Sequence, residues 1–178
     1  VAWEDVPCNK SFVELERMEP HPIKLGDAIV TYQALTHPDA VIAYAVEVGN
    51  FKVVYATDTE HKDSPDPRLL KLALNANVLY YDSQYTPGEY RGEPGSITGA
   101  FPKFDWGHST YEWAVKTALA GNIPNVILGH HDPVRNDFQL EQILKDAIAY
   151  RDRVLALPEL KGKSLEIHMG YEGMEWKF

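Results

Sequence analysis

The sequence is poor in the residues that would build a disulfide-bonded, redox or membrane-bound protein. It has one cysteine, Cys8, so neither an internal disulfide nor a Cys-x-x-Cys motif for zinc or redox chemistry is present. The longest apolar runs are only as long as a strand, and residues 1–30 do not show the basic and then apolar order of a signal peptide. These absences predict no membrane span and a reducing, cytoplasmic location.

Basic side chains are also scarce. Seventeen Lys and Arg residues stand against 26 Asp and Glu residues, which gives a formal net charge of −9. Such a charge opposes contact with phosphate backbones and anionic lipids, so nucleic acid is an unlikely partner on electrostatic grounds. The 178 residues are 44% hydrophobic and 24% charged, which is ordinary for one globular domain.

The order of predicted elements indicates the fold class. Residues 1–27 are predicted to be irregular or to form an edge strand, and loop residues are expected over 86–107. The other predicted elements are strands at 28–35, 41–48, 52–56, 78–81, 126–128 and 165–169, a short helix after Asp66, a helix from a Ser109/Glu112 capping box to about Ala120, and a long helix containing Leu140 to Leu155. Strands followed by alternating helices and strands predict one α/β domain.

Histidines and carboxylates stand where the predicted strands end. His37, Asp58 and the pair His130-His131 each follow such a strand. Imidazoles and carboxylates brought to one edge of a sheet are the usual donors of a hydrolytic metal site. With one cysteine and no His-x-His pair among seven histidines, any metal must be held by separate histidines and carboxylates.

Each of these residues also has a plain structural explanation. Asp58 fits a metal-bridging carboxylate and a turn or helix-cap aspartate about equally well. His37 precedes a proline, and an isolated histidine of this kind is more often structural than a ligand. Adjacent histidines on an extended backbone point to opposite sides, so only one of His130 and His131 is expected to bind metal.

A second pair of residues has the chemistry of an acid or base. His108 lies near the start of a predicted helix, where the helix dipole lowers its basicity, and Asp82 at a strand end is expected to restore that basicity through a hydrogen bond. In the adjoining loop, Tyr85 and Arg91 are predicted to border a substrate cleft; an ordinary surface loop is the alternative.

Over about residues 28–140 the chain resembles the second half of metallo-β-lactamase-fold hydrolases, and most closely the branch with ribonuclease Z and the cyclic phosphodiesterases. The resemblance implies the αββα sandwich of that fold, present mainly as its C-terminal half. It is carried by five motifs in the family's order: Leu35-Thr36-His37-Pro38, Tyr55-Ala56-Thr57-Asp58-Thr59-Glu60, Tyr81-Asp82-Ser83-Gln84-Tyr85, Trp106-Gly107-His108-Ser109-Thr110 and Leu128-Gly129-His130-His131-Asp132-Pro133.

The resemblance implies roles for five of these residues. His37, Asp58 and His131 match ligands of a site that holds two divalent metal ions when complete, with zinc expected and manganese or iron as alternatives. His108 matches a histidine that is not a ligand and assists the phosphoryl transition state, and Asp82 matches its orienting carboxylate.

One family motif is missing. The family carries a His-x-His-x-Asp-His signature upstream, and nothing before His37 matches it. Because the first residue is Val1 and most ligands are absent, we expect residues 1–178 to be an incomplete domain. The N-terminal half would then belong to a longer protein, or another chain or a homo-oligomer would complete the site. An isolated half would also expose an apolar sheet face.

These observations lead to three functional hypotheses. The first is a metal-dependent hydrolase, a phosphodiesterase that uses metal-activated water on a small or cyclic phosphodiester. The second is a catalytically silent module that kept the fold for binding or assembly. The third is a tRNA 3′-processing endonuclease, which the net charge disfavours. Whether this chain alone is an enzyme, and on which substrate, is left open by the sequence.

Overall fold

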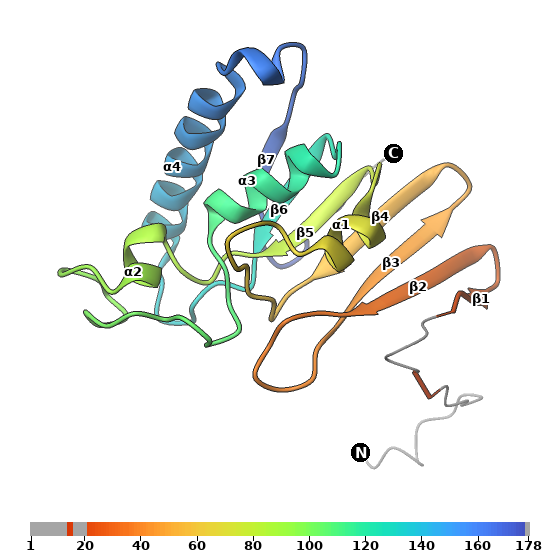
Figure 1. Cartoon of the computed structure of the whole chain (residues 1–178), viewed down its shortest axis with the longest axis horizontal. Coiled ribbons are helices and arrows are strands. Elements are labelled where there is room, and N and C mark those ends of the chain that lie inside the picture. The colour runs from red at the N-terminus through yellow and green to blue at the C-terminus, as the bar shows by residue number, and fades with distance from the viewer. Residues whose placement is uncertain (1–13, 16–20, 177–178) are drawn as a thin grey trace.

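Helices pack against one face of a single seven-stranded sheet (Figure 1). The computed structural model describes residues 14–15 and 21–176. Its strands are β1 (Ile23–Leu25), β2 (Ala28–Ala34), β3 (Ile42–Val48), β4 (Phe51–Ala56), β5 (Val78–Asp82), β6 (Asn125–Gly129) and β7 (Glu166–Met169). Its helices are α1 (Pro67–Ala73), α2 (Pro87–Arg91), α3 (Tyr111–Ala120), α4 (Asp137–Leu155) and the short 3-10 helix η2 (Pro158–Leu160).

The strands lie in the sheet in the order in which they occur in the chain. Strands β1 to β4 pair antiparallel, and β4 to β7 pair parallel through helical crossovers. Because β3 is antiparallel to both β2 and β4, those two strands run in the same direction. The carboxyl ends of β2, β4, β5 and β6 therefore meet at one edge of the sheet, where ligand sites of α/β sheets form.

The hydrophobic core lies between the sheet and its helices. Alternate residues of β3 and β4 face it, namely Ala43, Ala45, Val54 and Ala56, and three of these are alanines. Leu79 of β5 and Leu69 of α1 are also buried there. The alternation of side chains along a strand therefore decides which of them the helices cover.

The opposite face of the sheet is apolar and partly open. The exposed fractions are 37% for Tyr44, 51% for Tyr55 and 44% for Val48. The ring of Tyr55 stacks on that of Tyr80 with 5.0 Å between centroids. Within residues 21–176 no helix covers this face (Figure 1), so these rings are covered mainly by their neighbours in the sheet.

The α/β class is confirmed, and the strands begin and end within a few residues of the predicted positions. Two local predictions were wrong. The loop after β5 contains the short helix α2, which Thr86 and Glu89 cap reciprocally. Thr110, not Ser109, is the N-cap of α3, and it makes no side-chain capping bond.

Two further sequence predictions concern the chain's ends and membrane spans. The irregular segment predicted for residues 1–27 lies largely outside the described residues. Within residues 14–15 and 21–176, no helix has both the length and the apolar content needed to cross a bilayer.

Candidate metal centre

Three parallel strands each deliver one polar side chain to the carboxyl edge of the sheet. Asp58 follows β4, Asp82 is the last residue of β5, and His130 directly follows β6. Asp58 and His130 both adopt left-handed backbone conformations, with φ of 52° and 54°. Residues other than glycine rarely adopt this conformation, and such strain gathers at functional sites.

Asp82 is buried at this edge and contacts several neighbouring segments. Its side chain is 0% exposed and accepts hydrogen bonds from three backbone amides, those of Asp58 at 2.9 Å, Gln84 at 3.2 Å and Ser109 at 2.9 Å. His108 adds a fourth contact, with 3.0 Å between its Nδ1 and Asp82 Oδ2. One carboxylate thus holds together the segments after β4, after β5 and before α3.

The environment of His108 favours its protonated ring. Burial alone lowers the pKa of His108, but the hydrogen bond and charge of Asp82, helped by Asp58 and Glu60, outweigh burial and raise it. The ring stacks on His130 with centroids 5.1 Å apart and meets His37 edge to face at 5.8 Å. Since Asp82 occupies Nδ1, the other ring nitrogen is left for a ligand or substrate.

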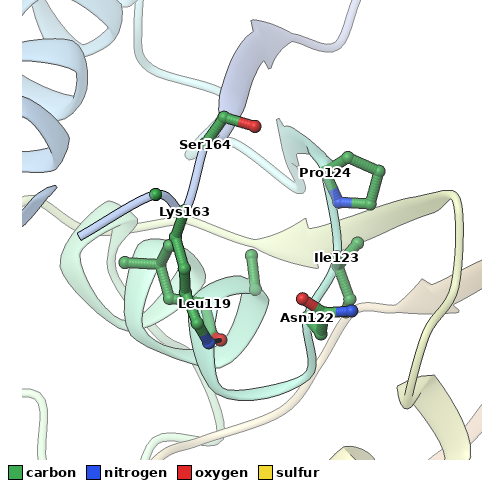
Figure 2. Close-up of a pocket in the computed structure, with 8 residues that line it drawn as sticks. Leu119, Asn122, Ile123, Pro124, Lys163 and Ser164 are labelled. Atoms are coloured by element: carbon green, nitrogen blue, oxygen red, sulfur yellow. Dashed lines mark hydrogen bonds between the residues drawn. The ribbon is translucent and has the colours of Figure 1, made fainter. Parts of the chain in front are cut away.

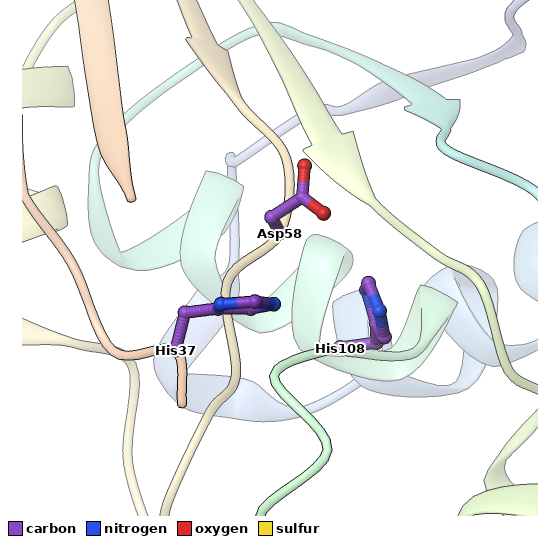
Figure 3. Close-up of side chains that lie close together, drawn as sticks. All are labelled: His37, Asp58 and His108. Carbon is purple, nitrogen blue, oxygen red and sulfur yellow. The ribbon is translucent and has the colours of Figure 1, made fainter. Parts of the chain in front are cut away.

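His37 reaches the same place from the loop after β2 (Figure 3). Its Nδ1 lies 3.1 Å from the amide nitrogen and 3.3 Å from the carbonyl oxygen of Asp39, which leaves Nε2 unengaged by Asp39. Gly107 packs directly on this ring, since a Cβ at position 107 would lie 2.0 Å from His37 Cδ2. Gly107 also has φ of +87°, so both space and backbone conformation require glycine there.

The donor atoms form two groups that could each hold a metal ion. One consists of His37, Asp58 and His108, and the other of Asp82, His108 and His130, with the donor atoms of each group within 4.8 Å of one another. A contact of 3.2 Å between His130 Nε2 and Asp58 Oδ1 joins the two groups. Imidazole nitrogens with carboxylate oxygens suit zinc and similar first-row divalent ions, so the residues present fit a divalent metal.

His131 is in neither group; its neighbour His130 takes the place next to Asp58. Both ring nitrogens of His131 are buried and have no hydrogen-bond partner among the described residues. Burial, and then the charge of Arg135, lower the pKa of His131 more than the nearby carbonyls of Leu128 and Ser83 raise it. The left-handed backbone of His130 interrupts the extended strand. It therefore explains why His130, and not His131, lies next to Asp58.

The two residues predicted to border substrate have different surroundings. Tyr85 is buried, and its ring meets that of His108 edge to face with centroids 6.0 Å apart. Burial, followed by the charges of Asp132 and Asp82, raises the pKa of Tyr85 to about 12, so it stays a neutral phenol. Arg91 lies at the end of α2 and pairs with Glu93 at 2.7 Å, with both side chains exposed.

Two buried residues beside the centre were not expected from the sequence. Glu60 is 3% exposed and accepts hydrogen bonds from the loop that precedes His108. His61 stacks on Trp113 with centroids 4.4 Å apart, and its Nδ1 lies 2.8 Å from Ser109 Oγ.

Burial, with the charges of Lys116 and Lys62, lowers the pKa of His61 to about 3. It is therefore a neutral core histidine at neutral pH. The sequence did contain one signal for Glu60 and His61. The polar run Thr59-Glu60-His61 directly follows Asp58 at the end of a predicted strand.

Two hollows lie at different edges of the sheet, and one of them adjoins the centre. One opens next to His130 on the uncovered sheet face and is lined by Tyr80, Tyr171 and Trp176. The other (Figure 2) lies between the end of α3 and the starts of β6 and β7, at the edge of the sheet away from the histidines. There Lys163 Nζ donates to the carbonyl of Leu119 at 2.8 Å. Only the first hollow adjoins the metal-ligand candidates.

Comparison with solved structures identifies the architecture. The metallo-β-lactamase fold protein YhfI from Bacillus subtilis superposes with a TM-score of 0.63 at 17% identity, over 88% of this chain and 52% of that one. A putative zinc-dependent hydrolase of the metallo-β-lactamase superfamily from Thermotoga maritima gives 0.52 at 15% identity, over 85% of this chain and 69% of that one. The short form of human tRNase Z gives 0.51 at 16% identity, over 62% and 38%.

These likenesses show the metallo-β-lactamase fold that the motifs predicted. The chain spans about half the length of YhfI. No protein-family model matches the sequence, and no curated protein matches it either.

Proposed function

We propose that this centre binds divalent metal and hydrolyses phosphodiesters. The observation that carries the proposal is that two donor groups, one with His37 and Asp58 and one with Asp82 and His130, share His108 at the carboxyl edge of the sheet and are joined by the Asp58–His130 contact. Three donors from separate strands are the usual protein contribution to a catalytic zinc site. We infer zinc as the metal, with manganese or iron as alternatives and a second ion in a complete site.

The proposed ligand set assigns each donor an atom. His37 and His130 offer Nε2, and Asp58 offers two carboxylate oxygens that can serve two ions. A bound divalent cation supplies a Lewis acid that activates water and neutralises negative charge on the phosphoryl oxygens. In this assignment His130 replaces His131, the ligand implied by the family resemblance.

We assign the proton transfer to the Asp82–His108 pair. Asp82 holds Nδ1 of His108, which orients the opposite nitrogen, and its hydrogen bond and charge raise the pKa of His108 despite burial. A protonated imidazole beside the centre donates to the oxygen that leaves phosphorus, as a general acid. We also propose that Tyr85 contacts the substrate, because its neutral phenol ring lies next to His108.

A small or cyclic phosphodiester is the favoured substrate class. The His108 motif, Gly-His-Ser-Thr, supports phosphodiester chemistry by its family resemblance, and the net charge of −9 opposes long polyanions. The fold likeness to human tRNase Z keeps tRNA 3′ processing as a second candidate. The single cysteine fits a cytoplasmic enzyme.

Metal content and turnover test this function together. We expect near-stoichiometric zinc by elemental analysis, and turnover of a chromogenic bis-aryl phosphodiester that a chelator abolishes and added zinc restores. Asp58→Asn, which keeps the shape and tolerates the left-handed backbone, is expected to lose metal. Metal without turnover favours the silent-module hypothesis, and absence of both contradicts the proposed function. Turnover of a tRNA precursor in preference to the small ester would favour tRNA processing.

A further inference from the structure

Glu60 is a buried carboxylate surrounded by hydrogen-bond donors. Its Oε1 accepts from the Tyr90 hydroxyl at 2.5 Å and from the Asp105 amide at 2.8 Å, and its Oε2 accepts from the Gly107 amide at 3.1 Å. A charged carboxylate that is 3% exposed is costly to bury unless its oxygens are hydrogen-bonded. Here both oxygens are used, and two of the three donors belong to one backbone turn.

That turn connects directly to the candidate metal centre. Gly107 precedes His108 in the chain and packs on the ring of His37 without space for a Cβ. The backbone of Glu60 reaches the other side, because its amide donates to the carbonyl of Thr36 at 3.0 Å, one residue before His37. Glu60 therefore touches the segments that carry both histidines.

We propose that Glu60 is the positioning residue that holds the His108 turn against the His37 loop, and so sets the spacing of these two imidazoles. The proposal rests on the proposed function only for its consequence in metal binding. Glu60 itself points its carboxylate at Tyr90, Asp105 and Gly107 and is not one of the metal-ligand candidates.

A carboxylate is required because every neighbour is a donor. Glutamine has the same shape, but its amide nitrogen would face a donor on one side and lose at least one of the three bonds. Alanine would lose all three and leave the Gly107 and Asp105 amides without this partner. Tyr90→Phe would remove only one donor and keep the two backbone contacts. The expected order of effect is therefore Glu60→Ala, then Glu60→Gln, then Tyr90→Phe.

The first experiment measures geometry without metal. Imidazole nitrogen and carbon resonances of the metal-free protein report the tautomer and surroundings of each histidine. In Glu60→Gln we expect the resonances of His37 and His108 to shift together, while those of His168, on β7, stay in place. Leu72→Ala, a buried substitution on α1, is the control for general loss of stability and should leave both imidazoles unchanged.

The second experiment measures zinc affinity by titration calorimetry. We expect Glu60→Gln to weaken binding 10- to 100-fold, the usual range for groups that orient metal ligands, and Tyr90→Phe to weaken it less. If Glu60→Ala does not fold, the other two variants still test the order.

The two experiments separate the two proposals. Unshifted His37 and His108 resonances with unchanged zinc affinity would overturn the role of Glu60 and leave the metal centre intact. Shifted His37 and His108 resonances in Glu60→Gln, together with a wild-type protein that binds no zinc, would support the role of Glu60 and overturn the proposed function. If Glu60→Gln and Leu72→Ala shift the His37 and His108 resonances equally, Glu60 only stabilises the fold and does not position these imidazoles.

Discussion

The helix-covered face of the sheet and its carboxyl edge are built from opposite kinds of residues. The covered face is made of small and aliphatic side chains such as Ala45, Val54 and Leu79, each fully buried. The edge carries histidines and carboxylates, with two left-handed backbone residues, Asp58 and His130. The same strands supply both, so a strand can stabilise the fold along its length and serve the site at its end. Stability and metal binding should therefore respond to different substitutions.

The largest effect is expected on the covered face. Leu79→Ala removes a fully buried side chain of β5 and leaves a cavity, which should lower the free energy of unfolding by about 2–5 kcal/mol. Chemical denaturation measures this loss. Zinc affinity, measured where the variant is still folded, should stay within about 3-fold of wild type, roughly 0.7 kcal/mol. A parallel loss of affinity would mean that the two regions are energetically coupled.

At the edge, two neighbouring histidines provide a matched pair. His130→Gln removes a proposed ligand and should weaken zinc binding by about 100-fold, or ~2.7 kcal/mol. His131→Gln should leave the affinity near wild type, because His131 lies outside both donor groups. Calorimetric titration of zinc into both variants shows whether His130 or His131 is the ligand. The reverse result would restore His131 as the ligand and show that the turn at His130 changes when metal binds.

Between the two regions, His61 links stability to pH. Its pKa is about 3 in the folded protein against 6.5 unfolded, so below pH 6.5 the unfolded chain binds a proton that the folded chain does not. Stability is therefore present above pH 6.5 and is lost as the pH falls toward 3, with a slope of up to about 1.4 kcal/mol per pH unit. Denaturation between pH 5 and 7 should show a shallower slope in His61→Gln. Identical slopes would contradict a neutral buried His61.

The smallest effect is expected at Arg91, which was predicted to border substrate. Its ion pair with Glu93 is exposed, so Arg91→Ala should change stability by less than about 0.5 kcal/mol. Zinc affinity should not change. A rise in KM for the phosphodiester, with unchanged kcat, is the one result that would make Arg91 a substrate contact.

Much of the fold was predictable because short apolar runs rich in β-branched and aromatic residues mark the strands. Along β3, Ala43 and Ala45 are buried while Tyr44 between them is 37% exposed, as expected for the two faces of a strand. Helix α2 was missed because it has only five residues inside a segment rich in glycine and proline. Its Thr86-Pro87-Gly88-Glu89 start did contain the capping box that the structure shows.

The site was predictable in composition but less so in detail. The edge where His37, Asp58 and His108 meet follows from which strands share a direction. The placement of His130 and His131 did not follow, since alternation holds only for extended backbone and His130 has φ of 54°. Glu60 was missed because its partners are backbone amides of a distant turn, and sequence patterns do not show which amides lack partners.

The left-handed backbone at Asp58 and His130 limits which mutations natural variation can sample there. Asparagine and glycine adopt this conformation at little cost, whereas alanine or a branched residue strains the chain as well as removing a donor. A lineage that loses the proposed metal binding is therefore expected to drift first to asparagine or glycine at these two positions. Homologues that carry either residue at both positions would mark descendants that kept this architecture without the proposed metal site.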